Sequence, residues 1–272
     1  MDDGLRIIVC IKQVPDTTEV EIDPQRGTLN REGVPSIINP FDTYALEEGL
    51  RLRESLGGEV RAISMGPLQA EEALKEAIAM GCDGGVLLSD PAFAGADTWV
   101  TAYTLAWAIR RIGPFDLVLC GRQAIDGDTG QVGPGIARQL GIAQLTYVSK
   151  IQKIDLQGRR VCVERLLEEG REIVEAPLPA LLTVLKDINE PRAPTFMGMR
   201  RARRAQIPVW SASDLTEEGA EGRFFGLRGS PTRVVKVFNP PPREGQAEII
   251  EAQEVSKTAN ILVERLLAEK VI

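Results

Sequence analysis

The sequence predicts an α/β fold with an open, mostly parallel sheet, flanking helices, an antiparallel extension and a C-terminal helical arm. In the first half of the chain, short apolar runs rich in β-branched residues alternate with segments of helix length. Such runs suit strands buried on both faces, and the helical segments are long enough to connect parallel strands. From about residue 145, strand-length segments joined by short turns take over, which predicts antiparallel strands. The 272 residues are 43% hydrophobic, enough for one or two compact domains.

The elements of the first half follow in order along the chain. The predicted strands cover residues 5–11, 59–65, 85–88 and 115–120. The predicted helices cover residues 41–56, 68–80, 98–112 and 130–140. Asn39 is a candidate N-cap before Pro40 at the first helical position, and Gly57 and Gly81 are placed to end the first two helices.

The second half contains predicted strands at residues 145–154, 160–166, 172–176 and 180–185, which extend the same domain. An extended stretch at 233–238 precedes a triple-proline spacer, and the last helix is predicted over 247–269. The apolar positions of this helix are Ile249, Ile250, Val255, Ile261, Leu262 and Leu266. It is interpreted either as an arm that packs on a partner chain or as a helix folded back on its own domain. We therefore divide the chain into an α/β domain over 1–238 and an arm over 239–272.

Charge and hydropathy exclude several classes of protein. The chain has 32 basic and 39 acidic residues, a net charge of −7, which disfavours a nucleic-acid binder and a polybasic membrane-surface protein. No apolar run approaches the roughly 18–20 residues that span a bilayer. The acidic start is followed by an apolar run too short for a signal peptide. We expect a cytoplasmic protein without direct membrane insertion.

The reactive side chains exclude further kinds of site. The sequence contains no histidine, which removes Ser-His-Asp and Cys-His nucleophile systems and nearly all zinc hydrolase sites. The four cysteines never form a CxxC pair, so an iron–sulfur or structural zinc site is disfavoured. Cys10 and Cys120 lie inside apolar runs and are interpreted as small core residues. We nominate no catalytic residue and no metal ligand.

The most unusual segment leads from a strand into a helix. It consists of Gly121, Arg122, Gln123, Ala124, Ile125, Asp126, Gly127, Asp128, Thr129, Gly130, Gln131, Val132, Gly133 and Pro134. In an open α/β sheet this transition lies at the carboxyl edge, where a helix N-terminus favours a phosphate. Asp126 and Asp128 would repel phosphate, so we assign them to loop capping or to a ribose. The spacing is neither GxGxxG nor Walker A, and a nucleotide site and a merely tight loop both stay open.

Three further segments fall on the same edge of the predicted sheet. They cover residues 10–16, 39–42 and 64–67, and each lies where a strand ends or a helix begins. All four segments are therefore expected to converge on one ligand. A plain N-cap role for Asn39 is the alternative.

A second unusual stretch covers residues 189–204. It places Phe196, Met197 and Met199 before four arginines in five residues, inside an acidic protein. Adaptable apolar residues beside arginines are typical of a docking surface. A solvated basic helix face is the other interpretation.

Together these segments resemble the beta (small) subunit of electron-transfer flavoproteins, and they are closest in motif to the bifurcating or Fix-type group. The likeness covers most of the chain, in the family's order, at residues 9–16, 39–42, 63–67, 77–83, 121–134 and 185–204. It implies an adenine-nucleotide α-hydrolase-like fold and a heterodimer with an alpha subunit that holds the redox-active FAD. Such a subunit passes electrons between NADH or acyl-CoA-type dehydrogenases and an acceptor. The resemblance therefore implies an electron-carrier subunit rather than a stand-alone enzyme.

The resemblance also implies the site residues by position. The family's nucleotide pocket falls on Cys10, Asn39, Pro40, Phe41, Asp42, Met65 and each residue from Gly121 to Val132. The family's partner-recognition loop falls on residues 191–201, including Phe196, Met197, Met199, Arg200 and Arg201. Phe196 stands at the apolar anchor, where leucine is common. This departure leaves open which dehydrogenase or quinone reductase is the partner.

The identity of the nucleotide is the finer question. In simple family members the pocket holds AMP, and in bifurcating members it holds a second FAD that exchanges hydride with NADH. The glycine-rich form of residues 126–134 and the segment 226–232 resemble the bifurcating group. FAD is therefore favoured. An AMP-binding structural subunit of a non-bifurcating carrier and a non-redox nucleotide-binding adaptor are the alternatives.

Overall fold

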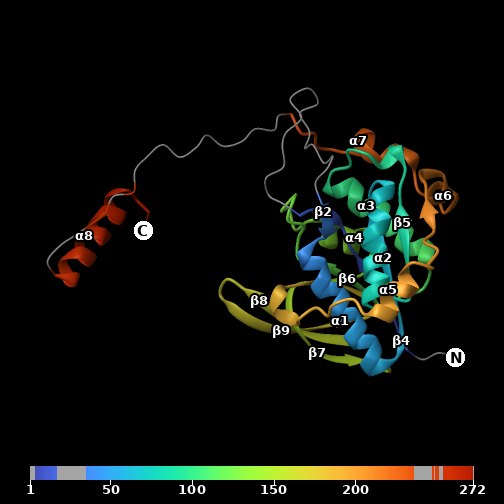
Figure 1. Cartoon of the computed structure of the whole chain (residues 1–272), viewed down its shortest axis with the longest axis horizontal. Helices are drawn as coiled ribbons and strands as arrows, with labels where there is room; N and C mark the ends of the chain where they lie inside the picture. The colour runs from blue at the N-terminus through green and yellow to red at the C-terminus, as the bar shows by residue number, and fades with distance from the viewer. Residues whose placement is uncertain (1–3, 17–34, 236–246, 248, 251–253, 272) are drawn as a thin grey trace. The chain divides into compact units, whose positions relative to one another are not determined.

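The computed structural model describes residues 4–16, 35–235, 247, 249–250 and 254–271. The chain divides into two units, Met1–Val235 and Lys236–Ile272. The first unit contains one large sheet with strand order β11-β5-β4-β1-β6-β10-β7-β8-β9, flanked by helices (Figure 1). The predicted α/β class with a mostly parallel sheet is confirmed.

The strands from β11 to β7 in this order are parallel. They are β11 (Val209–Trp210), β5 (Gly84–Leu88), β4 (Gly58–Met65), β1 (Leu5–Cys10), β6 (Leu117–Gly121), β10 (Ala180–Val184) and β7 (Ala143–Asp155). The predicted antiparallel extension is formed by β8 (Arg160–Leu167) and β9 (Gly170–Pro177), which follow β7. A small antiparallel pair, β2 (Gln13–Pro15) and β3 (Ser36–Ile38), lies beyond the end of β1.

Helices α1 to α5 lie between the strands along the chain, and α6 and α7 follow the last strand, β11. They are α1 (Pro40–Leu56), α2 (Glu71–Met80), α3 (Thr98–Ile112), α4 (Val132–Leu140), α5 (Phe196–Ala202), α6 (Ala212–Glu217) and α7 (Gly226–Gly229). Short 3₁₀ turns cover Leu68–Ala70, Pro91–Phe93, Lys186–Ile188 and Gly222–Phe224. Gly57 and Gly81 follow α1 and α2 with φ angles of 75° and 145°, a region that favours glycine. Both predicted helix stops are confirmed.

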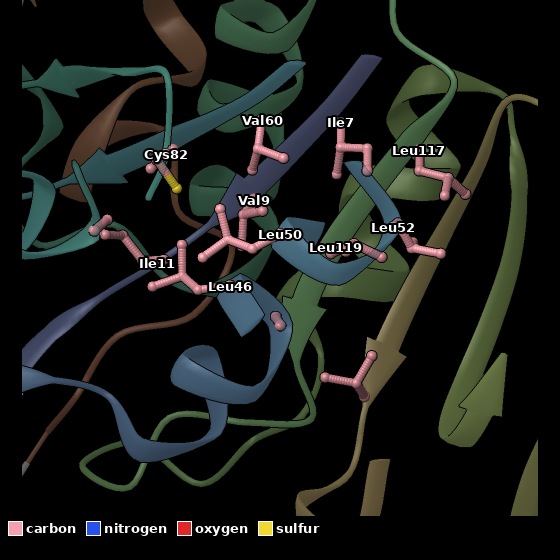
Figure 2. Close-up of a cluster of buried hydrophobic side chains, with 14 of the residues drawn as sticks. Ile7, Val9, Ile11, Leu46, Leu50, Leu52, Val60, Cys82, Leu117 and Leu119 are labelled. Carbon is pink, nitrogen blue, oxygen red and sulfur yellow. The ribbon is translucent and has the colours of Figure 1, made fainter. Parts of the chain in front are cut away.

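The sheet separates two hydrophobic cores. Successive side chains of a strand point to opposite faces, so Val9 packs into the core with α1 and α2, and Ile8 packs into the core with α3 and α4. Figure 2 shows the first of these cores, with Leu46 and Leu50 of α1 against β1 and β6. Because both faces of β1 and β6 are covered, a ligand reaches these strands only at their ends.

The element boundaries differ from the sequence predictions at a few points. The predicted helix over 68–80 is divided into a 3₁₀ turn and α2. The predicted helix over 130–140 begins only at Val132, because Gly130 has a φ of +63° that a right-handed helix does not accommodate. The sequence did not predict β11, α6 or α7, whose segments are too short for a period to show.

The C-terminal segment requires a further correction. Helix α8 covers Val255–Ala268, so the predicted start at residue 247 is wrong. Ile249 and Ile250 are not helical, and the extended backbone of Glu254 (φ −124°, ψ 135°) allows the helix to begin only at Val255. Residues 233–235 form no strand, and residues 236–246, including the triple-proline spacer, lie outside the described residues. Within the described part of the chain, no helix has the length and apolar character needed to cross a membrane.

Candidate functional site

The buried side chain of Asn39 fastens the glycine-rich loop to the start of α1. Asn39 is fully buried at the N-cap position, yet its side chain makes no capping hydrogen bond. Its Nδ2 donates to the Gln123 carbonyl at 2.8 Å, and the Ile125 N–H donates to its Oδ1 at 3.1 Å. The plain N-cap interpretation of this side chain is therefore wrong. Its amide matches one acceptor and one donor of the loop.

Asp42 joins three of the predicted segments. The Lys12 N–H donates to its Oδ2 at 2.8 Å, and the Gly121 N–H donates to its Oδ1 at 3.1 Å. One carboxyl group on α1 thus accepts hydrogen bonds from the residues that follow β1 and from the end of β6. Burial raises the pKa of Asp42 to about 7 from an ordinary 3.8, although hydrogen bonds from Asn39, Lys12 and Gly121 lower it.

This raised pKa predicts a pH-dependent stability. The folded protein holds the Asp42 proton more tightly than the unfolded chain, so this contribution is present below pH ~4 and is lost as the pH rises through about 7. Its upper bound is about 4 kcal/mol. Urea unfolding of the wild type and of Asp42→Asn between pH 4 and 8 measures it. We expect the wild type to lose stability relative to the variant between pH 4 and 7. A pH-independent difference would show that Asp42 is ionised throughout.

The two loop aspartates interact with side chains of the protein itself. The Lys12 Nζ lies 2.6 Å from Asp126 Oδ1, and the Gln123 side-chain amide donates to Asp128. Asp128 also adopts a positive φ of 52°, which aspartate tolerates better than most residues. The ion pair with Lys12 reduces the repulsion that Asp126 would exert on a phosphate.

The glycine-rich loop presents backbone donors that the protein does not use. In the described part of the chain, the N–H groups of Gly127, Thr129 and Gly130 have no hydrogen-bond partner. A Cβ atom added at Gly127 would meet nothing within 4 Å, so the loop is open on that side. Helix α4 begins two residues after Gly130 and directs its N-terminus toward the same region. Free N–H groups beside a helix N-terminus suit an anion.

The remaining predicted pocket residues lie at the same edge of the sheet but differ in burial. Cys10 and Cys120 are neighbours in the β1–β6 register and are both buried. The hydrogen bond between their thiols and their burial raise the pKa of Cys120 well above its ordinary value. Their interpretation as core residues is confirmed. Met65 ends β4 and packs on the second core, and Pro40 is exposed in the first turn of α1.

The second predicted surface lies on α5, beside α2. Phe196 is 76% exposed and Met197 is 66% exposed. The Thr195 hydroxyl caps the helix by accepting from the Gly198 N–H at 2.9 Å. Arg201 points back to the protein, where its guanidinium donates to the Ile78 and Cys82 carbonyls at 2.8 and 2.7 Å. Arg201 therefore fixes α5 in place.

An ion-pair cluster around the buried carboxylate of Glu47 anchors the segment before α5. Arg192 donates to Glu47 of α1 at 2.8 Å and also pairs with Glu54. These hydrogen bonds lower the pKa of both carboxyl groups. The apolar side chains of α5 are thus held outward by contacts on both sides of them.

Comparison with known proteins identifies the family. The sequence profile described as "Electron transfer flavoprotein domain" matches residues 26–215. The chain is 51% identical to "Electron transfer flavoprotein subunit beta" of Thermoanaerobacterium thermosaccharolyticum over 269 residues, covering 98% of this chain and 100% of that protein. The chain belongs to the electron transfer flavoprotein family.

Two further relatives have more specific names. The chain is 46% identical to "Protein FixA" of Azorhizobium caulinodans, covering 96% of this chain and 93% of the relative. It is also 46% identical to "Caffeyl-CoA reductase-Etf complex subunit CarD" of Acetobacterium woodii, covering 98% and 100%. The resemblance to a Fix-type electron transfer flavoprotein beta subunit is confirmed.

Several residues at the site of this electron transfer flavoprotein chain were not selected from the sequence. The Thr98 hydroxyl donates to Gln131 Oε1 at 2.9 Å, which joins the start of α3 to the loop. Asp97 accepts from the Thr232 N–H at 3.0 Å and so ties the segment after α7 to α3. Lys12 lies in the predicted segment 10–16. Its positive charge, together with the acidic residues of the glycine-rich loop, could have predicted its ion pair with Asp126. The contacts of Thr98 and Asp97 had no local signal, because their partners are 33 and 135 residues away.

Proposed function

We propose that this chain is an electron-transfer subunit that binds a nucleotide, FAD in the favoured form, and works as a heterodimer with an alpha subunit. In that complex it passes electrons between NADH or acyl-CoA-type dehydrogenases and an acceptor. Support comes from the beta-subunit names of its relatives and from one relative that is named as part of a reductase complex. The observation that carries the proposal is the glycine-rich loop at the edge of the sheet. It has backbone N–H groups without a partner among the described residues, and Asn39 bonds it to the start of α1.

The residues of this chain fit a nucleotide with phosphate groups. The N–H groups of Gly127, Thr129 and Gly130 would hold the phosphate oxygens, with the N-terminus of α4 adding a favourable dipole. Asn39 and Asp42 would keep the loop in place, because each of their side-chain polar atoms already bonds to the protein. FAD, when bound, supplies redox chemistry that no side chain of this chain provides.

FAD is favoured over AMP because the loop is rich in glycine. Gly127 leaves open space beside the loop, and Gly130 adopts a positive φ, so the backbone can approach a larger ligand closely. A second FAD in this subunit would allow flavin-based bifurcation with NADH. With AMP, this chain would be a structural subunit of a simple carrier.

Counting the nucleotides released from the purified complex tests this proposal. The chain is co-expressed with its alpha subunit, denatured, and the released FAD and AMP are separated and quantified. We expect two FAD and no AMP per heterodimer. One FAD and one AMP would contradict the FAD assignment and keep the nucleotide site. A heterodimer without nucleotide in this subunit would contradict the site itself.

We assign the docking of a redox partner to the exposed face of α5. Phe196, Met197 and Met199 present apolar surface that the protein leaves uncovered, next to Arg200 and Arg203. Exposed apolar side chains framed by arginine are typical of interface centres. Helix α8 carries apolar residues at Ile261, Leu262 and Leu266, a spacing that suits packing of one helix face against another surface. We assign α8 to contact with the alpha subunit.

Charge reversal on α5 tests the docking assignment. The double variant Arg200→Glu/Arg203→Glu replaces two positive side chains with negative ones. We expect its rate of electron transfer to the cognate dehydrogenase to fall by about tenfold or more at low ionic strength. The matched control is Lys150→Glu/Lys153→Glu on β7, which changes net charge equally at two exposed lysines. Equal rates in wild type and α5 variant would show that these arginines do not dock the partner.

A further inference from the structure

Tyr147 has an unusual backbone conformation. Its φ is +58°, which bulky side chains rarely adopt. It lies in an irregular part of β7, where the register with β10 shifts between the pairs Leu182–Leu145 and Val184–Val148. The extra residue turns the Tyr147 side chain out of the regular alternation of the strand.

Hydrogen bonds on both sides hold this conformation. The Tyr147 N–H donates to the hydroxyl of buried Thr183 at 3.3 Å. Arg165 of β8 makes two hydrogen bonds to Thr146, the residue before Tyr147. Its Nε donates to the Thr146 carbonyl at 2.7 Å, and its Nη2 donates to the Thr146 hydroxyl at 2.9 Å. The bulge is therefore fixed by three contacts from neighbouring strands, and strain that is fixed in this way is typical of functional positions.

The ring of Tyr147 faces the first charged residue of the glycine-rich loop. The Arg122 guanidinium carbon lies 5.6 Å from the ring centroid, within the range of a cation–π contact. The Tyr147 side chain remains about half exposed. Arg122 donates from Nε to the Gln123 side-chain carbonyl at 2.7 Å, and it makes no ion pair with any described carboxylate. The loop thus begins with a positive charge that the described residues do not neutralise.

We propose that Tyr147 is a positioning residue that holds the Arg122 guanidinium toward the anionic groups of the bound nucleotide. This inference rests on the proposed nucleotide site. The aromatic face attracts the guanidinium without using its N–H groups. The Nε N–H already donates to Gln123, so the N–H groups on Nη1 and Nη2 stay available to phosphate oxygens. A carboxylate at position 147 would also hold Arg122, but it would cancel the charge that an anionic ligand needs.

The Tyr147 ring also limits the freedom of a long side chain. Arg122 without a partner would sample many rotamers, and ligand binding would then require ordering it. The bulge supplies the ring from β7, whereas Asn39 at the start of α1 bonds to Gln123 and Ile125. Arg122 is therefore held independently of the loop's attachment to α1.

A double-mutant cycle on the co-expressed heterodimer tests this role. Bound nucleotide is removed, and AMP and FAD are each titrated by calorimetry into wild type, Tyr147→Leu, Arg122→Gln and the double variant. We expect each single variant to raise Kd about tenfold, the size of one lost charge-assisted contact. The double variant is expected to match Arg122→Gln, because the ring acts only through the arginine. Both single variants should also lower the salt dependence of Kd.

Two substitutions separate positioning from folding. Tyr147→Phe keeps the ring and is expected to keep the wild-type Kd. Tyr147→Gly removes the ring but favours a positive φ, so it should unfold at a Tm no lower than that of Tyr147→Leu and still bind weakly. Wild-type affinity in Tyr147→Leu, or a roughly hundredfold additive loss in the double variant, would overturn the inference. A wild-type complex that binds neither AMP nor FAD would overturn the proposed function as well.

Discussion

Asn39→Ala is expected to release the nucleotide from this subunit. The substitution leaves the Gln123 carbonyl and the Ile125 N–H without their buried partner. We expect the free energy of unfolding to fall by about 1–3 kcal/mol, since two part-buried hydrogen bonds are lost and each contributes about 0.5–1.5 kcal/mol. Because the loop is then no longer fastened to α1, bound nucleotide per heterodimer should fall at least about tenfold. Denaturation followed by nucleotide quantification measures the second effect.

Asn39→Asp tests whether the site needs the Nδ2 donor of Asn39 or only a side chain of the same size and shape. Aspartate can still accept from the Ile125 N–H, but its second oxygen would face the Gln123 carbonyl in place of the Nδ2 donor. Two acceptors then oppose each other, so we expect Asn39→Asp to lose nucleotide as well.

Asn189→Ala is the matched control for Asn39→Ala. Asn189 also donates to a backbone carbonyl of α1, that of Tyr44, at 3.0 Å, and it contacts Glu48 at 2.9 Å. It does not touch the glycine-rich loop, so its loss should lower stability and leave nucleotide binding unchanged. Equal nucleotide loss in both variants would mean that general destabilisation, and not the Asn39 contact, empties the site.

Gly121→Ala is expected to have the second large effect. A Cβ atom at this position would lie 2.4 Å from Asp42 Oδ1 and 2.5 Å from the backbone carbonyl carbon of Phe41. Those distances are far below van der Waals contact, and backbone atoms of a helix start cannot move as a side-chain tip can. We expect the free energy of unfolding to fall by about 3 kcal/mol or more. Urea unfolding measures the loss.

Gly127→Ala is the control within the same loop. No atom lies within 4 Å of a Cβ atom there, so stability should change by less than about 0.5 kcal/mol. The pair therefore distinguishes glycine needed for close packing from glycine that only leaves space. If Gly121→Ala were as stable as Gly127→Ala, the close approach of β6 to α1 would be wrong.

The sequence predicted most of the fold because the first half repeats a simple pattern. The run in β1 is apolar at every position except Arg6, as expected for a strand buried on both faces. Gly57 and Gly81 correctly predicted the ends of α1 and α2, because the backbone there adopts a positive φ that favours glycine. The pattern failed in β11, α6 and α7, whose few residues carry no period, and at the start of α8, where the extended backbone of Glu254 delays the helix to Val255.

The sequence predicted the candidate site only as far as its segments. Strand-to-helix transitions fall at one edge of a parallel sheet, so residues 10–16, 39–42 and 121–134 could be grouped before any contact was known. The roles within the group were less predictable. Asn39 has the sequence signature of an N-cap. Its side chain, however, makes no capping bond and instead donates to the carbonyl of Gln123, 84 residues further along the chain.

The sequence by itself determined the class of sheet, most helix boundaries and the family, since these depend on local pattern and on motifs in order. Tertiary structure alone decided that Asp42 accepts from Lys12 and Gly121, that Asp126 pairs with Lys12, and that Tyr147 faces Arg122. Each of these pairs joins residues that are distant in the chain or on different strands. Their partners are set by strand order and register, which the chain fixes only when its buried faces pack together.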